Sequence, residues 1–514
     1  MRSAPQDGGR TLLFIPSESS LMQLYNTLGR RKEKFETVNS GKVGLYACGV
    51  TVYDDCHLGH ARSSVFFEVL VRYLRRRGYE VTWVRNYTDI DDKILKRARD
   101  EGEAWDEIAA RYIASFQEDM AALGIPPAEI EPKATEHIPE MLEIIGRLVE
   151  KGFAYQGTPN GDVYYRVRRF PGYGKLSGQS LEDLEAGARI EVDAVKEDPL
   201  DFVLWKASKA GEPAWPSPWG PGRPGWHIEC SAMSMKYLGE TLDIHGGGRD
   251  LVFPHHENEL AQSEAANDRP FARFWVHHGL LTINQEKMSK SLQNFFTVKE
   301  VLEKFPAEVV RFFLISSHYR SPLDFSDAAL AEAETALLRL YAPLAKIQDI
   351  LREHPAPGNA PPRDLAAASL TAEELERLWT LPQRFDEALD DDVNTAQALG
   401  YMFDAVRLTN RLLENPTDDP AYLAFLAHLQ KELTSLGHVL NLLQADPAET
   451  MATLRQKPAD LAIAPEEIEA LIARRTEARK NKDWAGADKI RDELIGMGIL
   501  LEDTPQGTVW RVKG

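Results

Sequence analysis

Two separate stretches of the chain show the order strand, helix, strand, and this pattern constrains the fold most strongly. In the first, residues 43–47 predict a buried strand, 61–76 a helix with apolar residues on one face, and 79–84 a second strand. In the second, the sequence predicts a helix over 226–238, a strand over 241–244, a helix opening at Pro254 and a strand over 274–276. Such units build parallel sheets that bind ligands at the carboxyl ends of their strands. We therefore expect an α/β domain with a parallel, Rossmann-like sheet split by an insertion.

The remaining segments predict further domains. The insertion covers about 131–224 and contains Gly- and Pro-rich stretches, whereas residues after 326 are rich in Leu, Ala and Glu and predict helices. The last segment predicts two short helices followed by β-prone residues near 499–501 and 508–512. We therefore expect the following parts: an extension over 1–20, disordered; the sheet domain over 21–326; an α-helical bundle over 327–460; and a small α+β module over 461–514.

Composition excludes several classes of protein. No stretch approaches the ~18 uncharged apolar residues of a membrane helix, and the N-terminal segment lacks the apolar run of a targeting signal. Three cysteines in 514 residues are too few for a disulfide scaffold, which favours a reducing, cytoplasmic location. The net charge of -19 repels nucleic acid, so an RNA partner would have to bind local basic patches.

The motif His57-Leu58-Gly59-His60 lies between the first strand and the first helix. The start of a helix offers free N–H groups and a positive dipole end, and two imidazoles there can bind phosphate oxygens. Taken alone, the motif more often represents two surface histidines in a polar turn.

A second motif, Lys287-Met288-Ser289-Lys290-Ser291, follows the last predicted strand. Two lysines in a mobile loop, Lys287 and Lys290, can stabilise a phosphate whose negative charge rises in the transition state. A solvated lysine-rich loop is the alternative interpretation of this motif on its own.

Together these motifs resemble the paired motifs of class I aminoacyl-tRNA synthetases. Several further segments resemble the cysteinyl enzymes of that class: LYACGVTVYDDCHLGHAR (45–62), NYTDIDDK (86–93), PGWHIECSAM (224–233) and DIHGGGRDLVFPHHENE (243–259). Clear similarity extends over about 24–325. The chain departs from the family pattern at Gln285 and Gln293, where glycine is usual, and at His278, where asparagine is common.

The resemblance implies one zinc ion bound by Cys48, Cys230, His255 and Glu259. His255 and Glu259 are four residues apart and would project from one helix face, but spacing alone leaves buried apolar cysteines as the alternative. Zinc prefers thiolates, so the metal would select cysteine over serine, which an apolar pocket separates by only about 10 to 200-fold.

The resemblance also assigns the substrate contacts. ATP, accompanied by Mg²⁺, would be bound by His57, Gly59, His60, Gly246, Gly247 and Lys290, and L-cysteine by Thr88, Trp226 and His245. For Trp226, a core or interface aromatic is the alternative, and for Thr88 a solvated loop.

Basic residues gather around Trp484 near the C-terminus, which suits phosphate contact and base stacking. A solvated amphipathic helix is the alternative. With the resemblance, we expect tRNA(Cys) as the partner and a monomeric ligase.

The sequence argues against two rival functions. One is a ligase that joins cysteine to a small amine, which would lack the basic C-terminal segment. The other is a non-catalytic RNA- or zinc-binding relative, which would lack one of the two motifs.

Overall fold

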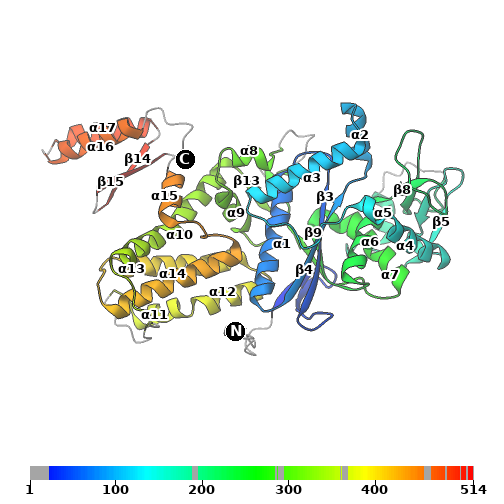
Figure 1. Ribbon diagram of the computed structural model, residues 1–514, viewed down its shortest axis with the longest axis horizontal. Coiled ribbons are helices and arrows are strands. Elements are labelled where there is room, and N and C mark those ends of the chain that lie inside the picture. Colours follow the sequence, from blue (N-terminus) through cyan, green and yellow to red (C-terminus); the bar gives the residue numbers. More distant parts are fainter. Residues whose placement is uncertain are drawn as a thin grey trace, which may run out of the picture. The chain divides into compact units, whose positions relative to one another are not determined.

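The computed structural model describes residues 22–187, 195–283, 286–287, 295–358, 361, 369–455, 465–480, 483–497, 499–504 and 507–512 (Figure 1). The predicted extension over 1–20 and the residues Gln285, Lys290 and Gln293 lie outside this set. The chain divides into two compact units. One contains Met1–Phe325, Pro382–Tyr401 and Val439–Asn441, and the other contains Ser326–Leu381, Met402–His438 and Leu442–Gly514.

A four-stranded parallel sheet of order β10-β9-β3-β4 forms the centre of the first unit. Its strands are β3 (Lys42–Thr51), β4 (Glu80–Thr88), β9 (Leu242–Gly248) and β10 (Ala272–His278). Every residue of β9 is buried, as expected when helices cover both faces of a parallel sheet. Helix α1 (Leu58–Arg76) lies on one side and α6 (Trp226–Leu238) on the other (Figure 1). The two predicted strand–helix–strand units therefore join through β3 and β9, and the predicted fold class is confirmed.

An antiparallel sheet of order β5-β6-β7-β8 and helix α4 (Ile138–Glu150) lie between the two halves in sequence. The strands are β5 (Ala154–Gln156), β6 (Val163–Tyr165), β7 (Phe202–Ala207) and β8 (Gly222–Pro224). One apolar core includes Trp205 of this sheet, Met141 of α4 and Trp275 of β10. The inserted segment therefore packs onto the parallel sheet and does not form a core of its own.

Shorter elements complete the first unit. They are β1 (Gln23–Asn26), β2 (Arg31–Lys34), α2 (Asp92–Glu101), α3 (Trp105–Ala122), α5 (Leu181–Gly187), α7 (Glu257–Asn267), β11 (Leu281–Ile283), β12 (Glu286–Lys287), α8 (Val298–Leu302), α9 (Ala307–Ile315) and β13 (Leu323–Phe325).

The second unit is mainly helical. It contains α10 (Asp327–Glu353), α11 (Ala372–Trp379), α15 (Pro447–Arg455), α16 (Pro465–Lys480) and α17 (Trp484–Gly496), and the hairpin of β14 (Ile499–Thr504) and β15 (Gly507–Val512). Helices α12 (Leu381–Asp390), α13 (Thr395–Leu412) and α14 (Pro420–Leu440) contribute residues to both units. Isoleucines and a leucine of α16, α17 and β14 form a small separate apolar cluster. Within the described part of the chain, no helix is long and apolar enough to cross a membrane.

Candidate active site

A cavity of about 370 Å³ opens where β3, β4, β9 and β10 end. Its wall includes residues of the histidine motif, predicted cysteine contacts and predicted zinc ligands. They are His57, Gly59, His60, Thr88, Trp226, Cys48, Cys230 and His255. The structure therefore brings the histidine motif and three of the four predicted zinc ligands to one cavity, although they come from segments up to about two hundred residues apart.

The four predicted zinc ligands, Cys48, Cys230, His255 and Glu259, have ligand atoms within 4.8 Å of one another. The two Sγ atoms are 3.8 Å apart, and Cys48 Sγ lies 3.7 Å from Glu259 Oε1. Tetrahedral zinc with bonds of about 2.0–2.3 Å places its ligands roughly 3.3–3.8 Å from one another, so these separations and this donor set suit zinc. His227 Nδ1 lies 2.9 Å from His255 Nδ1. The second ring nitrogen of His255, Nε2, is therefore the one that could bind a metal.

The charges of these groups depend strongly on one another. Burial raises the pKa of the Cys48 thiol, whereas the hydrogen bond from Cys48 lowers the pKa of Cys230. Burial opposes ionisation of Glu259, but His245 and His255 outweigh it and hold the pKa of this carboxyl at about 2. Burial lowers the pKa of His255, but Glu259 and Cys230 raise it to about 10. A bound cation would therefore replace the proton on His255 as the positive partner of the Glu259 carboxylate and the Cys230 thiolate.

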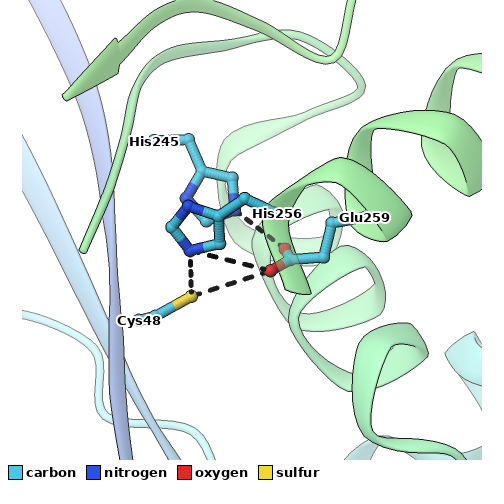
Figure 2. A group of neighbouring side chains, drawn as sticks. All are labelled: Cys48, His245, His256 and Glu259. Atoms are coloured by element: carbon cyan, nitrogen blue, oxygen red, sulfur yellow. Dashed lines mark hydrogen bonds and ion pairs between the residues drawn. The ribbon is translucent and has the colours of Figure 1, made fainter. Parts of the chain in front are cut away.

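A second group shares two members of the first, and Figure 2 shows it: Cys48, His245, His256 and Glu259. His245 Nε2 lies 2.8 Å from Glu259 Oε2, and His256 Nε2 lies 3.2 Å from Cys48 Sγ. Both histidines are fully buried, and neither lines the cavity. Three members of the set with Cys230 and His255 line the cavity, against only Cys48 of the other set. A metal held by the first set would therefore border the cavity, and His245 and His256 would orient its ligands.

A chain of hydrogen bonds continues behind His256. His256 Nδ1 lies 2.8 Å from His277 Nε2, and His277 Nδ1 lies 2.8 Å from Thr27 Oγ1. Sequence reasoning missed His227, His256 and His277. The available signal was density, because six of the thirteen histidines lie within 227–278.

The histidine motif forms the N-terminal cap of α1. His57 Nδ1 accepts a hydrogen bond from the backbone N–H of Gly59 (3.0 Å), and His60 Nδ1 accepts one from the backbone N–H of His57 (3.3 Å). Each Nδ1 is therefore unprotonated, so each neutral ring carries its proton on Nε2. Burial lowers the pKa of His57 to about 4 and also lowers that of His60, so both rings are neutral at pH 7.

Gly59 allows the two rings to stack, with centroids 3.7 Å apart. A Cβ at this position would lie 2.8 Å from His57 Cε1. A side chain at Gly59 would therefore displace the His57 ring.

Of the lysine motif, Lys287 ends β12, and Lys290 lies outside the described residues. The segment that follows the motif is bonded to the histidine motif: Leu58 N donates to Phe296 O (3.3 Å), and Val298 N donates to Cys56 O (2.9 Å). The Phe295 ring also packs edge-on against His57. The described segment that begins at Phe295 is thus bonded beside the histidine motif.

Of the remaining predicted substrate contacts, two line the cavity and two do not. Thr88 lines the cavity and donates to Glu229 Oε2 (2.9 Å), and the Trp226 ring stacks on His255 with centroids 4.2 Å apart. A Cβ on Gly246 would meet Phe67, and a Cβ on Gly247 would meet Leu251 and His256. Gly248, rather than these two glycines, lines the cavity, and ATP contact by Gly246 and Gly247 stays a prediction.

Comparison with known proteins agrees with this architecture. Residues 34–335 match the family model of the tRNA synthetase class I (C) catalytic domain, 384–444 a DALR domain, and 464–511 the cysteinyl-tRNA ligase anticodon binding domain. The structure of methionyl-tRNA synthetase from Mycobacterium tuberculosis, solved with methionyl-adenylate, covers 81% of this chain and 94% of its own at a TM-score of 0.61 and 17% identity. The fold and the matched catalytic-domain model are those of a class I aminoacyl-tRNA synthetase.

Relatives identify the family within that class. The cysteine–tRNA ligases of Geobacter metallireducens and Geobacter sulfurreducens are 56% and 57% identical over 96% of this chain and 100% of their own length. The chain belongs to the cysteine–tRNA ligases.

Proposed function

We propose that this ligase activates L-cysteine with ATP, releases pyrophosphate, and transfers the cysteinyl group from the adenylate to the 3′ end of tRNA(Cys). One observation carries the proposal: a single cavity joins a thiol-rich ligand set to two neutral histidines at the start of a helix. Cysteine and ATP could therefore meet there, with the carboxylate near the α-phosphorus.

The histidine motif would bind the phosphates of ATP. Neutral His57 and His60 carry Nε2–H groups, which are hydrogen-bond donors and suit phosphate oxygens. The N-terminus of α1 adds its positive dipole end. Lys287 and Lys290 would supply positive charge as pyrophosphate departs, and Mg²⁺ would accompany ATP.

The ligand set would select cysteine. Cys48, Cys230, His255 and Glu259 would hold zinc, which would bind the substrate sulfur as a further ligand and prefers a thiolate to a hydroxyl. Trp226 and Thr88 would form the neighbouring wall, while His245 would act through Glu259, which it holds at 2.8 Å.

The C-terminal module would bind the anticodon region of tRNA. Trp484 is 60% exposed, and Arg474, Lys480 and Lys489 are exposed on the same pair of helices. An exposed aromatic ring beside cations suits base stacking and phosphate contact. We expect the ligase to act in the cytoplasm as a monomer.

ATP–pyrophosphate exchange with each of the twenty amino acids tests the first half of the reaction, and charging of a tRNA(Cys) transcript tests the second. Cysteine alone should support exchange. Exchange with cysteine but no charging of tRNA would favour the rival ligase that uses a small amine.

A further inference from the structure

One buried ring nitrogen at the cavity belongs neither to the proposed zinc ligands nor to the two motifs. His278 ends β10, is 6% exposed and lines the cavity. Its Nε2 has no hydrogen-bond partner among the residues that the structure describes. An unpaired buried polar atom costs free energy, so a ligand that satisfies it would bind more tightly.

The protonation of this ring is fixed by its other nitrogen. His278 Nδ1 lies 3.0 Å from the carbonyl oxygen of Gly279, which can only accept, so Nδ1 carries the proton. Burial lowers the pKa of His278 to about 4, despite the opposing carbonyl contact, so the ring is neutral at pH 7. Nε2 is then an acceptor, and its missing partner must be a donor.

The surroundings of Nε2 show what kind of donor fits. Gly248 has no side chain in front of the ring: a Cβ there would lie 3.6 Å from both Nε2 and Cε1 of His278 and 2.6 Å from Asp250 Oδ1, and Asp250 also lines the cavity. The Phe67 ring lies edge-on to the His278 ring, with centroids 6.5 Å apart. Phe67, Leu280 and Leu281 line the same cavity. Glycine backbone, an aromatic ring and two leucines suit a flat base, and the Asp250 carboxylate on the same wall would repel a phosphate there.

We propose that His278 Nε2 accepts a hydrogen bond from the exocyclic amino group of adenine and so helps the site to select ATP. The inference rests on the proposed function, because it assumes that the nucleotide binds in this cavity. A ribose hydroxyl is the other donor on ATP. Phe67, Leu280 and Leu281 favour the base beside His278, whereas the Asp250 carboxylate would accept from a ribose hydroxyl. In a guanine nucleotide the corresponding atom is an oxygen, whose lone pairs would face those of Nε2.

The test compares nucleotides in cysteine-dependent pyrophosphate exchange. Purine riboside triphosphate lacks the amino group, and 2′-deoxy-ATP lacks a ribose hydroxyl. His278→Phe removes the acceptor but keeps a ring, His278→Gln can place an amide oxygen near the position of Nε2, and His278→Asn, the matched control, reaches only the position of Nδ1.

The wild type should have a KM for purine riboside triphosphate about 3–10-fold above that for ATP, the size of one neutral hydrogen bond. His278→Phe should raise the KM for ATP by about the same factor and abolish the difference between the two nucleotides. The kcat should stay within about twofold, because the amino group is bound equally in the ground and transition states. His278→Gln should restore the difference, and His278→Asn should not.

Equal weakening of both nucleotides by His278→Phe, or equal behaviour of the Gln and Asn variants, would overturn the proposal in favour of a packing role. Selective loss of discrimination against 2′-deoxy-ATP would overturn it in favour of the ribose. Calorimetric titration of the wild type and His278→Phe with the same nucleotides needs no turnover. It therefore tests His278 even if the proposed reaction with cysteine is absent.

Discussion

At the scale of single residues, the site depends on side chains that position the proposed zinc ligands. His245 holds Glu259 Oε2 at 2.8 Å, and His256 contacts Cys48 at 3.2 Å. His256 is held in turn by His277. Such supporting hydrogen bonds fix the orientation of the ligands before a metal binds, and removing one typically weakens metal binding by about 10–100-fold.

The chain offers a matched pair of cysteines for testing the ligand set. Cys230→Ser should reduce bound zinc well below the one ion per chain that we expect, and should weaken the preference for cysteine over serine, because a neutral hydroxyl is a poor zinc ligand. Metal analysis and pyrophosphate exchange with the two amino acids measure these effects.

Cys56→Ser is the control. Cys56 is also buried, but it belongs to neither ligand group. Full zinc and unchanged selectivity in Cys230→Ser would show that the metal is not bound by this residue.

At the scale of elements, the sequence predicts the sheet and α1 well because their signals are local. Val65, Val69 and Tyr73 recur at helical spacing, and all three are fully buried in α1. The position of His57 at a strand–helix junction is also local information. The contacts among the proposed zinc ligands are not local information, because Cys48 and Glu259 are separated by 211 residues. Only the resemblance to a known family predicted that they meet.

The contact between Thr27 and His277 joins residues 250 apart and was not predicted at all. Hydrophobic periodicity indicates which face of an element is buried, but it does not indicate which polar atoms will meet there. The contacts of the supporting histidines with the ligands could therefore be found only in the structure.

Arg62 connects α1 to two loops. This fully buried guanidinium donates to the carbonyl oxygens of Leu280 (2.7 Å), Tyr319 (3.2 Å) and Ser321 (2.5 Å). Arg62→Met should lower the free energy of unfolding by about 2–4 kcal/mol, because it leaves these carbonyls unpaired, and Arg62→Lys should lower it less. Urea unfolding followed by circular dichroism measures the change.

Arg31→Met is the control, because it makes the same substitution at an arginine whose side chain is 77% exposed. It should lower the free energy of unfolding by under about 0.5 kcal/mol. Similar midpoints for the Arg62 and Arg31 variants would mean that the buried hydrogen bonds do not stabilise the fold.

The lysine motif acts, in our proposal, on the transition state. Lys290→Ala should reduce kcat for pyrophosphate exchange by about 10²-fold or more and leave cysteine binding nearly unchanged. Lys304→Ala, an exposed lysine in the segment after the motif, is the control. A Lys290 variant impaired only in KM for ATP would instead identify a residue that binds ground and transition states equally.

At the scale of the whole molecule, our proposal assigns adenylate formation to the cavity and part of the binding of tRNA to the C-terminal segment. The cavity is lined entirely by residues before Ser326, whereas the segment that matches the anticodon binding domain is 464–511. A chain truncated before Pro465 should retain exchange and lose most charging of tRNA, with a higher KM for tRNA and a less steep salt dependence of tRNA binding. Equal loss of both activities would mean that the segment stabilises the fold and has no separate role in RNA binding.

Removal and return of zinc test the central claim most directly. The preparation is stripped with a chelator, and exchange with cysteine and with serine is measured before stripping, after it, and after zinc is restored. We predict that cysteine-dependent exchange falls steeply on stripping and returns with about one zinc per chain, while serine remains a poor substrate throughout. Unchanged exchange and unchanged selectivity in the metal-free protein would contradict selection of cysteine by zinc at Cys48, Cys230, His255 and Glu259.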